Sequence, residues 1–425
     1  MTKLGVIADD LTGANDTGVQ FSKLGLDTVV VWDLSTVKNV AVDAGTDVVV
    51  IDTESRADRQ EEAYSKVKEA TRSLMGVGVD LLFKKIDSTL RGNIGAELDG
   101  VCDAFGELIV LVAPAFPKNR RTTVRGRQLL DGVPLEYSAV GHDSLSPVRQ
   151  SDIASLIREQ TRRCVGHIPL EVVASGSDSL RSRILAEAQN GCKILVLDAV
   201  TNDHLNTIAK AASTLGSPVL LSGSAGLAEE VPLVFCLVSK GKQVLVVAGS
   251  MSEVTARQVA LLEKTLQIKP VTVDLGALLH AETARIDEMR KATKSLRQEL
   301  SDASTAILTL APLLEEGKEG NRQGRYPSYM DEFPRQIVLK ALGDIAAGTL
   351  SHAVSGMVLT GGDTGMTVIK AIGAESIKLD DEIEAGIAVG TVSGGSFSGI
   401  RVVTKAGAFG NDSSLLRAVG YLKRR

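Results

Sequence analysis

The chain has 425 residues, a net charge of -5, and only 3% aromatic residues. This length exceeds what one hydrophobic core usually supports, so we expect two domains. The charge and the scarcity of aromatic rings argue against nucleic acid as a partner, and the apolar runs are too short for a membrane span. Four widely spaced cysteines without a CxxC pair argue against a zinc site and a disulfide framework. With no signal peptide apparent, they predict a cytoplasmic protein.

The first predicted strand leads directly into two carboxylates. An apolar run at residues 4–8 ends in Asp9 and Asp10, and a candidate helix N-cap, Asn15 or Asp16, follows. Open α/β sheets bind ligands at the carboxyl ends of their strands. One of the two aspartates is expected to cap the next helix, but capping does not need both. The opening therefore predicts a small-molecule site.

Strand-like runs and helical patterns alternate through the first half, which is typical of a parallel α/β sheet. A helix is predicted at residues 61–74, and an Asp131-Gly132 turn predicts a hairpin. The predicted strands cover residues 4–8, 28–32, 48–51, 81–86, 108–113, 170–174, 193–197 and 219–221.

Polar clusters follow three of these strands, at Asp9-Asp10, at residues 52–56 and at residues 87–91. Because parallel strands point the same way, the clusters should share one rim of the sheet. Carboxylates there can accept hydroxyl hydrogens, and Arg56 and Arg91 can clamp a carboxylate. The combination suits a short polyhydroxy acid.

An arginine-rich segment at residues 118–127 follows the fifth strand. It is either a solvated basic loop or an electropositive lip that attracts an anionic ligand. Arg120 and Arg121 receive no specific role from the sequence.

The second half restarts with a strand at residues 243–248 and a helix from about Glu253. Residues 232–242 are the best linker candidate, so the expected domains are residues 1–235 and 243–425. The later predicted strands cover residues 271–273, 305–308, 357–359, 386–392 and 400–404.

Three glycine turns follow strands of this second half: Gly249-Ser250, residues 361–364 and residues 405–410. Glycines let backbone N–H groups approach phosphate oxygens, and Asp363 can meet Mg²⁺ directly or through water. The turns together predict a nucleotide site. No P-loop, no GxGxxG after a strand and no zinc-hydrolase or nucleophile-elbow pattern occurs, so general motifs do not demonstrate ATP binding.

The ordered motifs span nearly the whole chain and resemble the four-carbon acid sugar kinases, which phosphorylate threonate, erythronate or 3-oxo-tetronate with ATP. The resemblance is carried by residues 8–13, 52–56, 85–92, 114–117, 223–227, 249–250, 361–364 and 404–410. It implies an N-terminal acid-sugar-binding domain, a C-terminal nucleotide-binding domain and an active site in the cleft between the domains. The family more usually has a glycine where this chain has Arg120.

The resemblance also implies roles for individual residues. Catalysis is expected to depend on Asp10, Asp87 and Lys85. Substrate binding is expected from Asp9, Asp10, Arg56, Lys85, Ile86, Asp87, Ser88 and Arg91. ATP binding is expected from Ser250, Gly361, Gly362, Asp363, Thr364 and Gly407, with Asp363 also the expected Mg²⁺ ligand.

The continuation at residues 15–20 looks most like the D-threonate kinase branch, so we expect phosphorylation of the C4 hydroxyl of D-threonate. D-erythronate and 3-oxo-tetronate are the alternative substrates. A non-catalytic two-domain sugar-acid sensor is a more remote alternative, and an NAD-dependent dehydrogenase is disfavoured by the missing GxGxxG. A homodimer is expected from its frequency among soluble enzymes.

Overall fold

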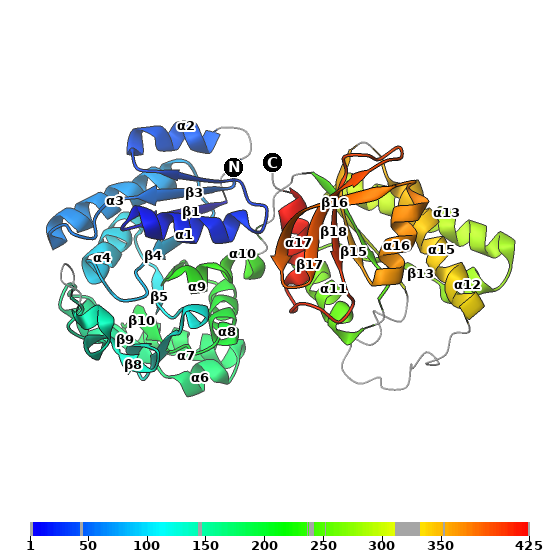
Figure 1. The fold of residues 1–425 in the computed structure, drawn as a ribbon. Helices are drawn as coiled ribbons and strands as arrows, with labels where there is room; N and C mark the ends of the chain where they lie inside the picture. Colours follow the sequence, from blue (N-terminus) through cyan, green and yellow to red (C-terminus); the bar gives the residue numbers. More distant parts are fainter. Residues whose placement is uncertain are drawn as a thin grey trace. The chain divides into compact units, whose positions relative to one another are not determined.

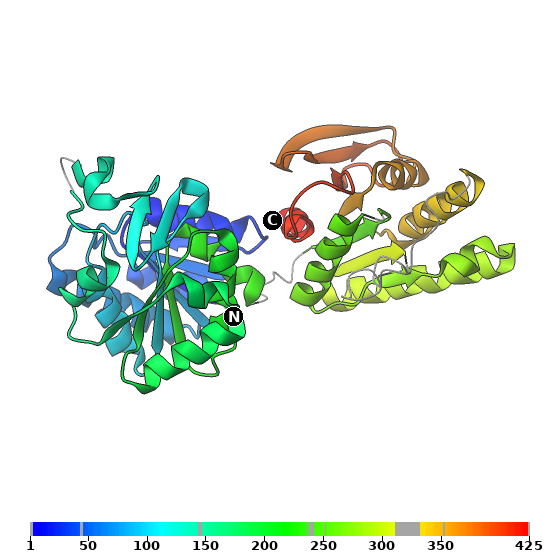
Figure 2. The same cartoon turned by 90° about the horizontal axis from the view of Figure 1, so that it is seen from below.

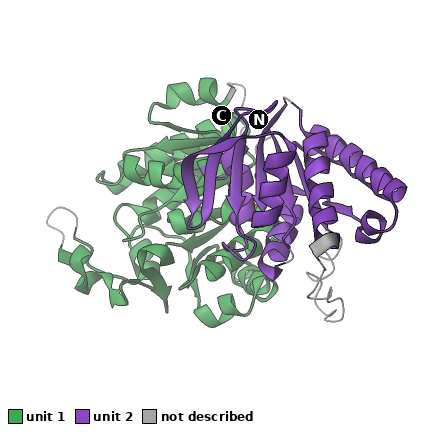
Figure 3. Cartoon of the chain, turned by 45° about the vertical axis from the view of Figure 1, so that its right-hand side comes forward, with its two compact units in different colours: residues 1–22, 26–237 green, residues 23–25, 238–425 purple. Residues whose placement is uncertain are grey.

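The computed structural model describes residues 3–42, 46–142, 147–235, 237, 242–250, 252–310, 332–351 and 353–423. The chain divides into two compact units, one of residues 1–22 and 26–237 and the other of residues 23–25 and 238–425 (Figure 3). Each unit is a largely parallel sheet flanked by helices, which confirms the predicted two-domain α/β fold. Of the expected linker, residues 236 and 238–241 lie outside the described residues.

The sheet of unit 1 has eight strands, all parallel, in the order β2-β3-β1-β4-β11-β5-β10-β9 (Figure 1). Its strands are short runs rich in Val, Ile and Leu, as expected of strands covered on both faces. They are β1 (Leu4–Ala8), β2 (Thr28–Val31), β3 (Val48–Asp52), β4 (Leu81–Lys85), β5 (Ile109–Ala113), β9 (Val165–Ile168), β10 (Ile194–Leu197) and β11 (Val219–Gly223).

Two hydrophobic cores cover the two faces of this sheet, because successive residues of a strand point to opposite sides. In β1, Val6 belongs to one core and Ile7 to the other. The first core receives α1 (Leu11–Ser22), α6 (Leu170–Ala174), α7 (Ser177–Gln189), α8 (Asn202–Ser213), α9 (Ala225–Ala228) and α10 (Val231–Val234). The second receives α2 (Val37–Val42), α3 (Gln60–Gly76), α4 (Ile94–Phe105) and α5 (Ile153–Arg158).

A small antiparallel sheet follows β5 and contains the predicted hairpin. At its turn Asp131 and Gly132 have φ of 54° and 78°, the left-handed conformation that a two-residue hairpin turn requires. Its strands are β6 (Arg121–Val124), β7 (Arg127–Leu130) and β8 (Val133–Pro134). Short 3₁₀ turns are η1 (Leu34–Thr36), η2 (Pro117–Asn119), η3 (Leu135–Tyr137) and η4 (Ala139–His142).

Two local sequence predictions in unit 1 were wrong. Residues 170–174 form helix α6 instead of a strand, because a short apolar run does not distinguish the two and Pro169 occupies the N-cap. The strand of this region is β9, which the sequence did not indicate because Gly166 and His167 interrupt its apolar pattern. Helix α1 begins at Leu11, so neither Asn15 nor Asp16 is its N-cap.

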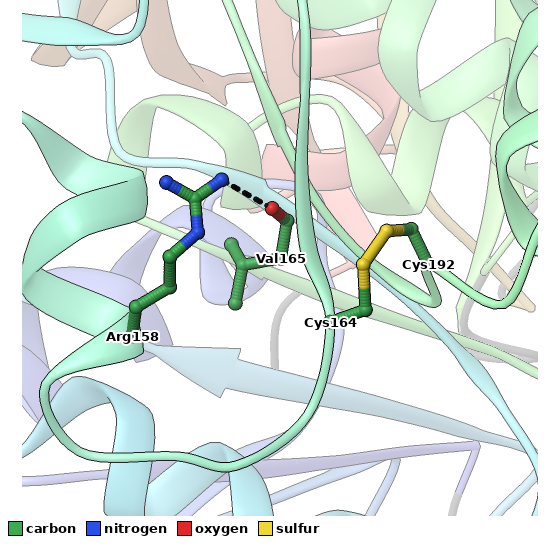
Figure 4. The surroundings of a disulfide bond; sticks show 4 residues. All are labelled: Arg158, Cys164, Val165 and Cys192. Carbon is green, nitrogen blue, oxygen red and sulfur yellow. Dashed lines mark hydrogen bonds between the residues drawn. A yellow bond between two sulfur atoms is a disulfide. The ribbon is translucent and has the colours of Figure 1, made fainter.

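A disulfide joins Cys164 and Cys192, contrary to the sequence expectation (Figure 4). The two cysteines precede the neighbouring strands β9 and β10, in which Val165 pairs with Ile194. This places their Cα atoms 4.7 Å apart despite a sequence separation of 28. Wide spacing in the sequence therefore did not exclude the pairing, because parallel strands start at the same edge of a sheet.

The sheet of unit 2 has seven strands in the order β13-β14-β12-β15-β18-β17-β16, in which β17 is antiparallel to both of its neighbours and the other pairs are parallel. Strands β16 and β17 form the orange hairpin of Figure 2. The strands are β12 (Gln243–Ala248), β13 (Val271–Val273), β14 (Thr305–Leu310), β15 (Val354–Thr360), β16 (Ser376–Glu384), β17 (Ile387–Ser393) and β18 (Arg401–Lys405). Strand β16, mostly exposed and charged, was not predicted.

Helices cover this sheet as well. One face carries the third hydrophobic core, to which α12 (Leu275–Leu279), α13 (Glu282–Ala303), α15 (Glu332–Thr349) and α16 (Gly362–Ala371) contribute. Helix α17 (Ser414–Lys423) packs on β12 and β15 and contacts α11 (Glu253–Leu266). Among the described helices none is long and apolar enough to cross a membrane.

Candidate active site

The polar clusters predicted in unit 1 meet at the carboxyl edge of its sheet. Strands β3, β1 and β4 are neighbours, with Ala8 opposite Asp52 and Ile7 opposite Lys84. The loops that leave these strands therefore emerge together. They bring Asp9, Asp10 and Arg56 into direct contact.

Arg56 binds both aspartates with its whole guanidinium group. Its Nε and Nη2 donate to Asp9 at 2.7 and 2.9 Å, and its Nη2 and Nη1 each donate to Asp10 at 2.7 Å. Burial alone would lower the pKa of Arg56, but its hydrogen bonds to Asp9 and the charges of Asp9, Asp87 and Asp10 raise it. Four of the five guanidinium hydrogens are used, so Arg56 keeps one N–H for a ligand.

Asp9 and Asp10 differ in exposure. The Asp9 side chain is 2% exposed, whereas that of Asp10 is 26% exposed. Asp10 also accepts a 2.9 Å hydrogen bond from the N–H of Gly13 and so caps α1. Asp9 is therefore a buried anchor, and Asp10 is the carboxylate of the pair that a ligand can reach.

Lys85 places a buried ammonium group beside these carboxylates. The residue is 5% exposed, and its Nζ lies 2.9 Å from where a Cβ on Gly13 would stand. Among the described residues this Nζ has no hydrogen-bond partner. Burial lowers the pKa of Lys85, against the attraction of Asp9, Asp87 and Asp10. A desolvated cation without a hydrogen-bond acceptor is a strong attractor for an oxygen ligand.

Asp87 is held by the loop that follows it. Its carboxylate accepts hydrogen bonds from the Thr89 hydroxyl at 2.6 Å, from the Thr89 N–H at 3.2 Å and from Arg91 Nε. Burial raises the pKa of Asp87, but the hydrogen bonds from Arg91 and Thr89 outweigh it and bring the pKa to about 2. Asp87 is thus an orienting group and a poor proton acceptor.

Arg91 keeps a whole edge of its guanidinium group unused. Its Nε binds Asp87, while its two terminal amino groups have no partner among the described residues. The side chain is 36% exposed. Its open edge matches the two oxygens of a carboxylate.

Ile86 and Ser88, the two other residues of this segment expected at the substrate, are both buried. Ile86 is 1% exposed in a hydrophobic core, and its N–H donates to the Gly223 carbonyl. Its side chain therefore offers a ligand no contact. Ser88 is 9% exposed, and its carbonyl accepts a 2.7 Å hydrogen bond from Gln128 Nε2. Gln128 thereby ties β7 to the loop of Asp87.

A buried ion pair beneath the site was missed by sequence reasoning. Lys84 Nζ lies 2.8 Å from Glu97 and donates to the Lys85 carbonyl at 2.7 Å, and the other Glu97 oxygen accepts from Ser55 at 2.6 Å. Both charged side chains are at most 2% exposed. The pair joins α4 to the end of β4 and to the loop of Arg56. The only sequence signal was the lysine pair, whose members must point to opposite faces of a strand.

Unusual backbone conformations gather in the same loops. Glu54 and Leu90 have φ of 48° and 63°, which side-chain-bearing residues rarely adopt. At Gly92, with φ of 102°, a Cβ would lie 3.0 Å from an Asp9 oxygen. Such conformations persist only where surrounding contacts impose them, and they concentrate at ligand sites.

The arginine-rich segment is only partly a solvated loop. Arg120 has φ of 57° and a side chain 78% exposed that pairs with Asp131. It thus occupies a left-handed position that glycine tolerates best. The Nε of Arg121, in contrast, is buried without a partner in the described structure. The N–H of Arg125 donates to buried Asp198.

The three glycine turns of unit 2 also meet at one edge, because β12, β15 and β18 are neighbours. A Cβ on Gly407 would lie 1.9 Å from Ser250 Oγ, and one on Gly249 would lie 2.2 Å from Thr364 Oγ1. Gly361, with φ of 99°, stands beside both Ser250 and Thr364. At Gly249 and Gly407 a side chain would therefore collide with these hydroxyl-bearing residues.

Helix α16 starts in this group at Gly362 with no side-chain cap. Its first N–H groups are suited to an anion. Asp363, in its first turn, is 62% exposed and pairs with Arg335. The described residues contain no cluster of three or more His, Cys, Asp or Glu side chains that could hold a metal ion.

Comparison with protein families assigns each unit a ligand class. A sugar-binding N-terminal domain matches residues 4–231, and a nucleotide-binding C-terminal domain matches residues 245–415. Two α/β units of these kinds define a two-domain sugar kinase.

Relatives of known activity match this chain over nearly its full length. A D-threonate kinase of Salmonella typhimurium is 34% identical over 99% of this chain and 98% of its own. A D-erythronate kinase of Heliobacterium modesticaldum is 33% identical over 99% and 97%, and a 3-oxo-tetronate kinase of Pseudomonas fluorescens is 30% identical over 99% and 97%. The chain belongs to the four-carbon acid sugar kinase family and is a phosphotransferase. The kinase relatives imply that ATP is used.

A solved structure supports the fold. A Bordetella bronchiseptica protein, described as a domain-swapped dimer with bound citrate, has a TM-score of 0.63 and 29% identity. The match covers 99% of each chain.

Proposed function

We propose that this enzyme transfers the γ-phosphoryl group of ATP to the C4 hydroxyl of D-threonate, giving 4-phospho-D-threonate and ADP. The relatives support the four-carbon acid class, in which D-erythronate and 3-oxo-tetronate are the alternatives. The observation that carries the proposal is the open edge of Arg91 in a site that also holds the unpartnered ammonium of Lys85. Together they fit a small acid that also carries hydroxyl groups.

Within this proposal Arg91 binds the substrate carboxylate. Arg56 offers its one remaining N–H to a ligand and otherwise fixes Asp9 and Asp10. Asp10 accepts the proton of the attacking hydroxyl, since it is the accessible carboxylate. Asp87 is a weaker base, because its pKa is about 2. The hydroxyl oxygen forms the new bond to the γ-phosphorus as the bond to the β-phosphate oxygen breaks. Lys85 balances the negative charge near the reacting oxygens.

ATP is assigned to the glycine turns, with Ser250, Thr364 and the N–H groups of Gly362 and Gly407 at its phosphates, while Gly361, whose N–H donates to the Lys405 carbonyl, lets the chain turn beside them. Magnesium is carried mainly by those phosphates and needs few protein ligands. Asp363 is exposed in the first turn of α16 and is the residue suited to bind the magnesium ion. It would first have to release its ion pair with Arg335. Bound magnesium would neutralise charge on the phosphates during transfer.

Domains of residues 1–235 and 243–425 would hold the sugar acid and ATP respectively. Transfer then requires the two ligands to meet and water to be excluded while the phosphoryl group moves. We further propose a cytoplasmic homodimer, for which the Bordetella dimer is a precedent.

The test is ADP release from ATP and Mg²⁺ with D-threonate, D-erythronate and 3-oxo-tetronate measured side by side. Turnover with D-threonate at the highest kcat/KM supports the proposal. A preference for another acid corrects the substrate. A protein that binds a sugar acid but never releases ADP would instead be a sensor.

A further inference from the structure

One carbonyl in unit 2 receives an unusual number of donors. The Gly407 oxygen accepts hydrogen bonds from Ser252 Oγ at 2.6 Å, Thr255 Oγ1 at 2.9 Å and Lys405 Nζ at 3.1 Å. The preceding carbonyl, of Ala406, accepts from Lys405 Nζ at 3.0 Å. Lys405 therefore draws two successive carbonyls to the same side of the loop.

The orientation of these carbonyls fixes the direction of the next two N–H groups. In a trans peptide the C=O and N–H bonds point in opposite directions. The N–H groups of Gly407 and Ala408 thus point away from Lys405, and neither has a hydrogen-bond partner in the described structure. Adjacent outward N–H groups of this kind form an anion-binding concavity. The missing Cβ of Gly407 leaves room for Ser250 Oγ, which places a hydroxyl beside this part of the loop.

Lys405 also brings a positive charge that no carboxylate neutralises at hydrogen-bond distance among the described residues. The residue is 4% exposed, and only carbonyl oxygens accept its hydrogens. Burial lowers its pKa to about 8, while the charge of Glu384 acts in the opposite direction. An ammonium behind two peptide groups polarises them and strengthens their N–H groups as donors. The charge and the N–H groups point independently to an anionic ligand.

We propose that Lys405 is a positioning residue for the phosphate groups of the nucleotide, acting from behind the loop by turning the N–H groups of Gly407 and Ala408 toward them. The inference rests on the proposed ATP site and deepens it. It explains how a lysine can strengthen phosphate binding without touching the phosphates, in a chain that has no P-loop lysine.

The test compares phosphate-dependent and phosphate-independent affinity by calorimetric titration with ATP, ADP and adenosine. Lys405→Met should weaken ATP and ADP binding by about tenfold or more and leave adenosine binding unchanged. Thr255→Val removes one donor to the same carbonyl and should weaken ATP binding by about threefold. It keeps the test open if Lys405→Met does not fold, which circular dichroism would reveal.

Lys423→Met is the matched control, because Lys423 is a lysine of the same unit, 3% exposed, that donates to Ser304 Oγ. Its ATP affinity should stay at the wild-type value. Equal losses for ATP and adenosine, or unchanged ATP affinity in the Lys405 and Thr255 variants, would overturn the positioning role while leaving the kinase proposal intact. Wild-type protein that binds no ATP would overturn both.

Discussion

The candidate sites of the two units are built from different kinds of groups. In unit 1 the candidate site is dense in charge, with Asp9, Asp10 and Arg56 locked together and Lys85 beside them. In unit 2 the glycine turns offer backbone N–H groups and hydroxyls, and Lys405 lies behind the loop. A small acid with several hydroxyl groups needs donors and acceptors at fixed points. Phosphates need many donors of one kind, which a backbone supplies without side-chain entropy.

This difference in binding groups determines which single substitutions should have large effects. A charged side chain removed from unit 1 leaves a buried partner without its counter-charge, so effects there should be large. In unit 2 many of the proposed binding groups belong to the backbone, so apart from the hydroxyls a substitution can act only through residues that orient the backbone.

The largest effect is expected for Asp10→Asn. The variant removes the proposed proton acceptor but keeps an oxygen for the cap on Gly13, so kcat should fall by about 10²- to 10⁴-fold while ATP affinity is unchanged. Steady-state kinetics with calorimetry measures both. Asp131→Asn, at the exposed hairpin turn, is the control. Near-wild-type kcat in Asp10→Asn would remove this residue from the mechanism.

Breaking the buried pair beneath the site should be the next largest effect. Glu97→Gln leaves Lys84 charged and buried, which should lower the free energy of unfolding of unit 1 by about 3–5 kcal/mol in urea titrations. Glu107→Gln is the control, because it breaks an ion pair with Lys193 in which the Glu107 side chain is 87% exposed. It should lower the free energy of unfolding by at most about 1 kcal/mol. Similar losses for both variants would show that burial of the pair is unimportant.

Arg91→Met should raise KM for the sugar acid by about 10- to 100-fold and leave KM for ATP unchanged, because it removes the open guanidinium edge. Arg120→Met, which removes an arginine 78% exposed, should change neither constant. If KM for ATP rises instead, the assignment of Arg91 to the sugar acid is wrong.

The smallest effect concerns pH. The buried Lys85 has a pKa lowered from 10.5, so its charge is present below that pKa and lost as pH rises through it. At saturating ATP, kcat/KM for the sugar acid should therefore fall at a pH below 10.5. Lys85→Arg should move the fall upward, since guanidinium stays charged. An alkaline limb unmoved in this variant would assign the limb to another group.

The sequence predicted most strands and the meeting of the polar clusters, because apolar runs and parallel direction are local signals. It did not predict which side chains Arg56 would bind. That depends on the neighbouring order of β3 and β1, which no local pattern encodes. Arg56 was expected to clamp a substrate carboxylate, yet four of its hydrogens are directed to Asp9 and Asp10.

Sequence patterns were least informative where contacts join distant segments. The disulfide of Cys164 and Cys192 and the hydroxyl donors to Gly407 arise between segments far apart in the chain. The glycine turns themselves were visible, but the direction of their N–H groups was not. That direction follows from side chains such as Lys405 that the turns alone do not explain.

The strand order of unit 1 also constrains how the protein can be made. Strand β11, the last of this sheet in sequence, lies between β4 and β5, and its Gly223 carbonyl holds the N–H of Ile86, one residue before Asp87. A growing chain therefore cannot complete the sheet, or secure the loop of Asp87 and Arg91, until residue 223 has left the ribosome. Until then β4 and β5 each present an unpaired edge, and such edges favour pairing with other chains.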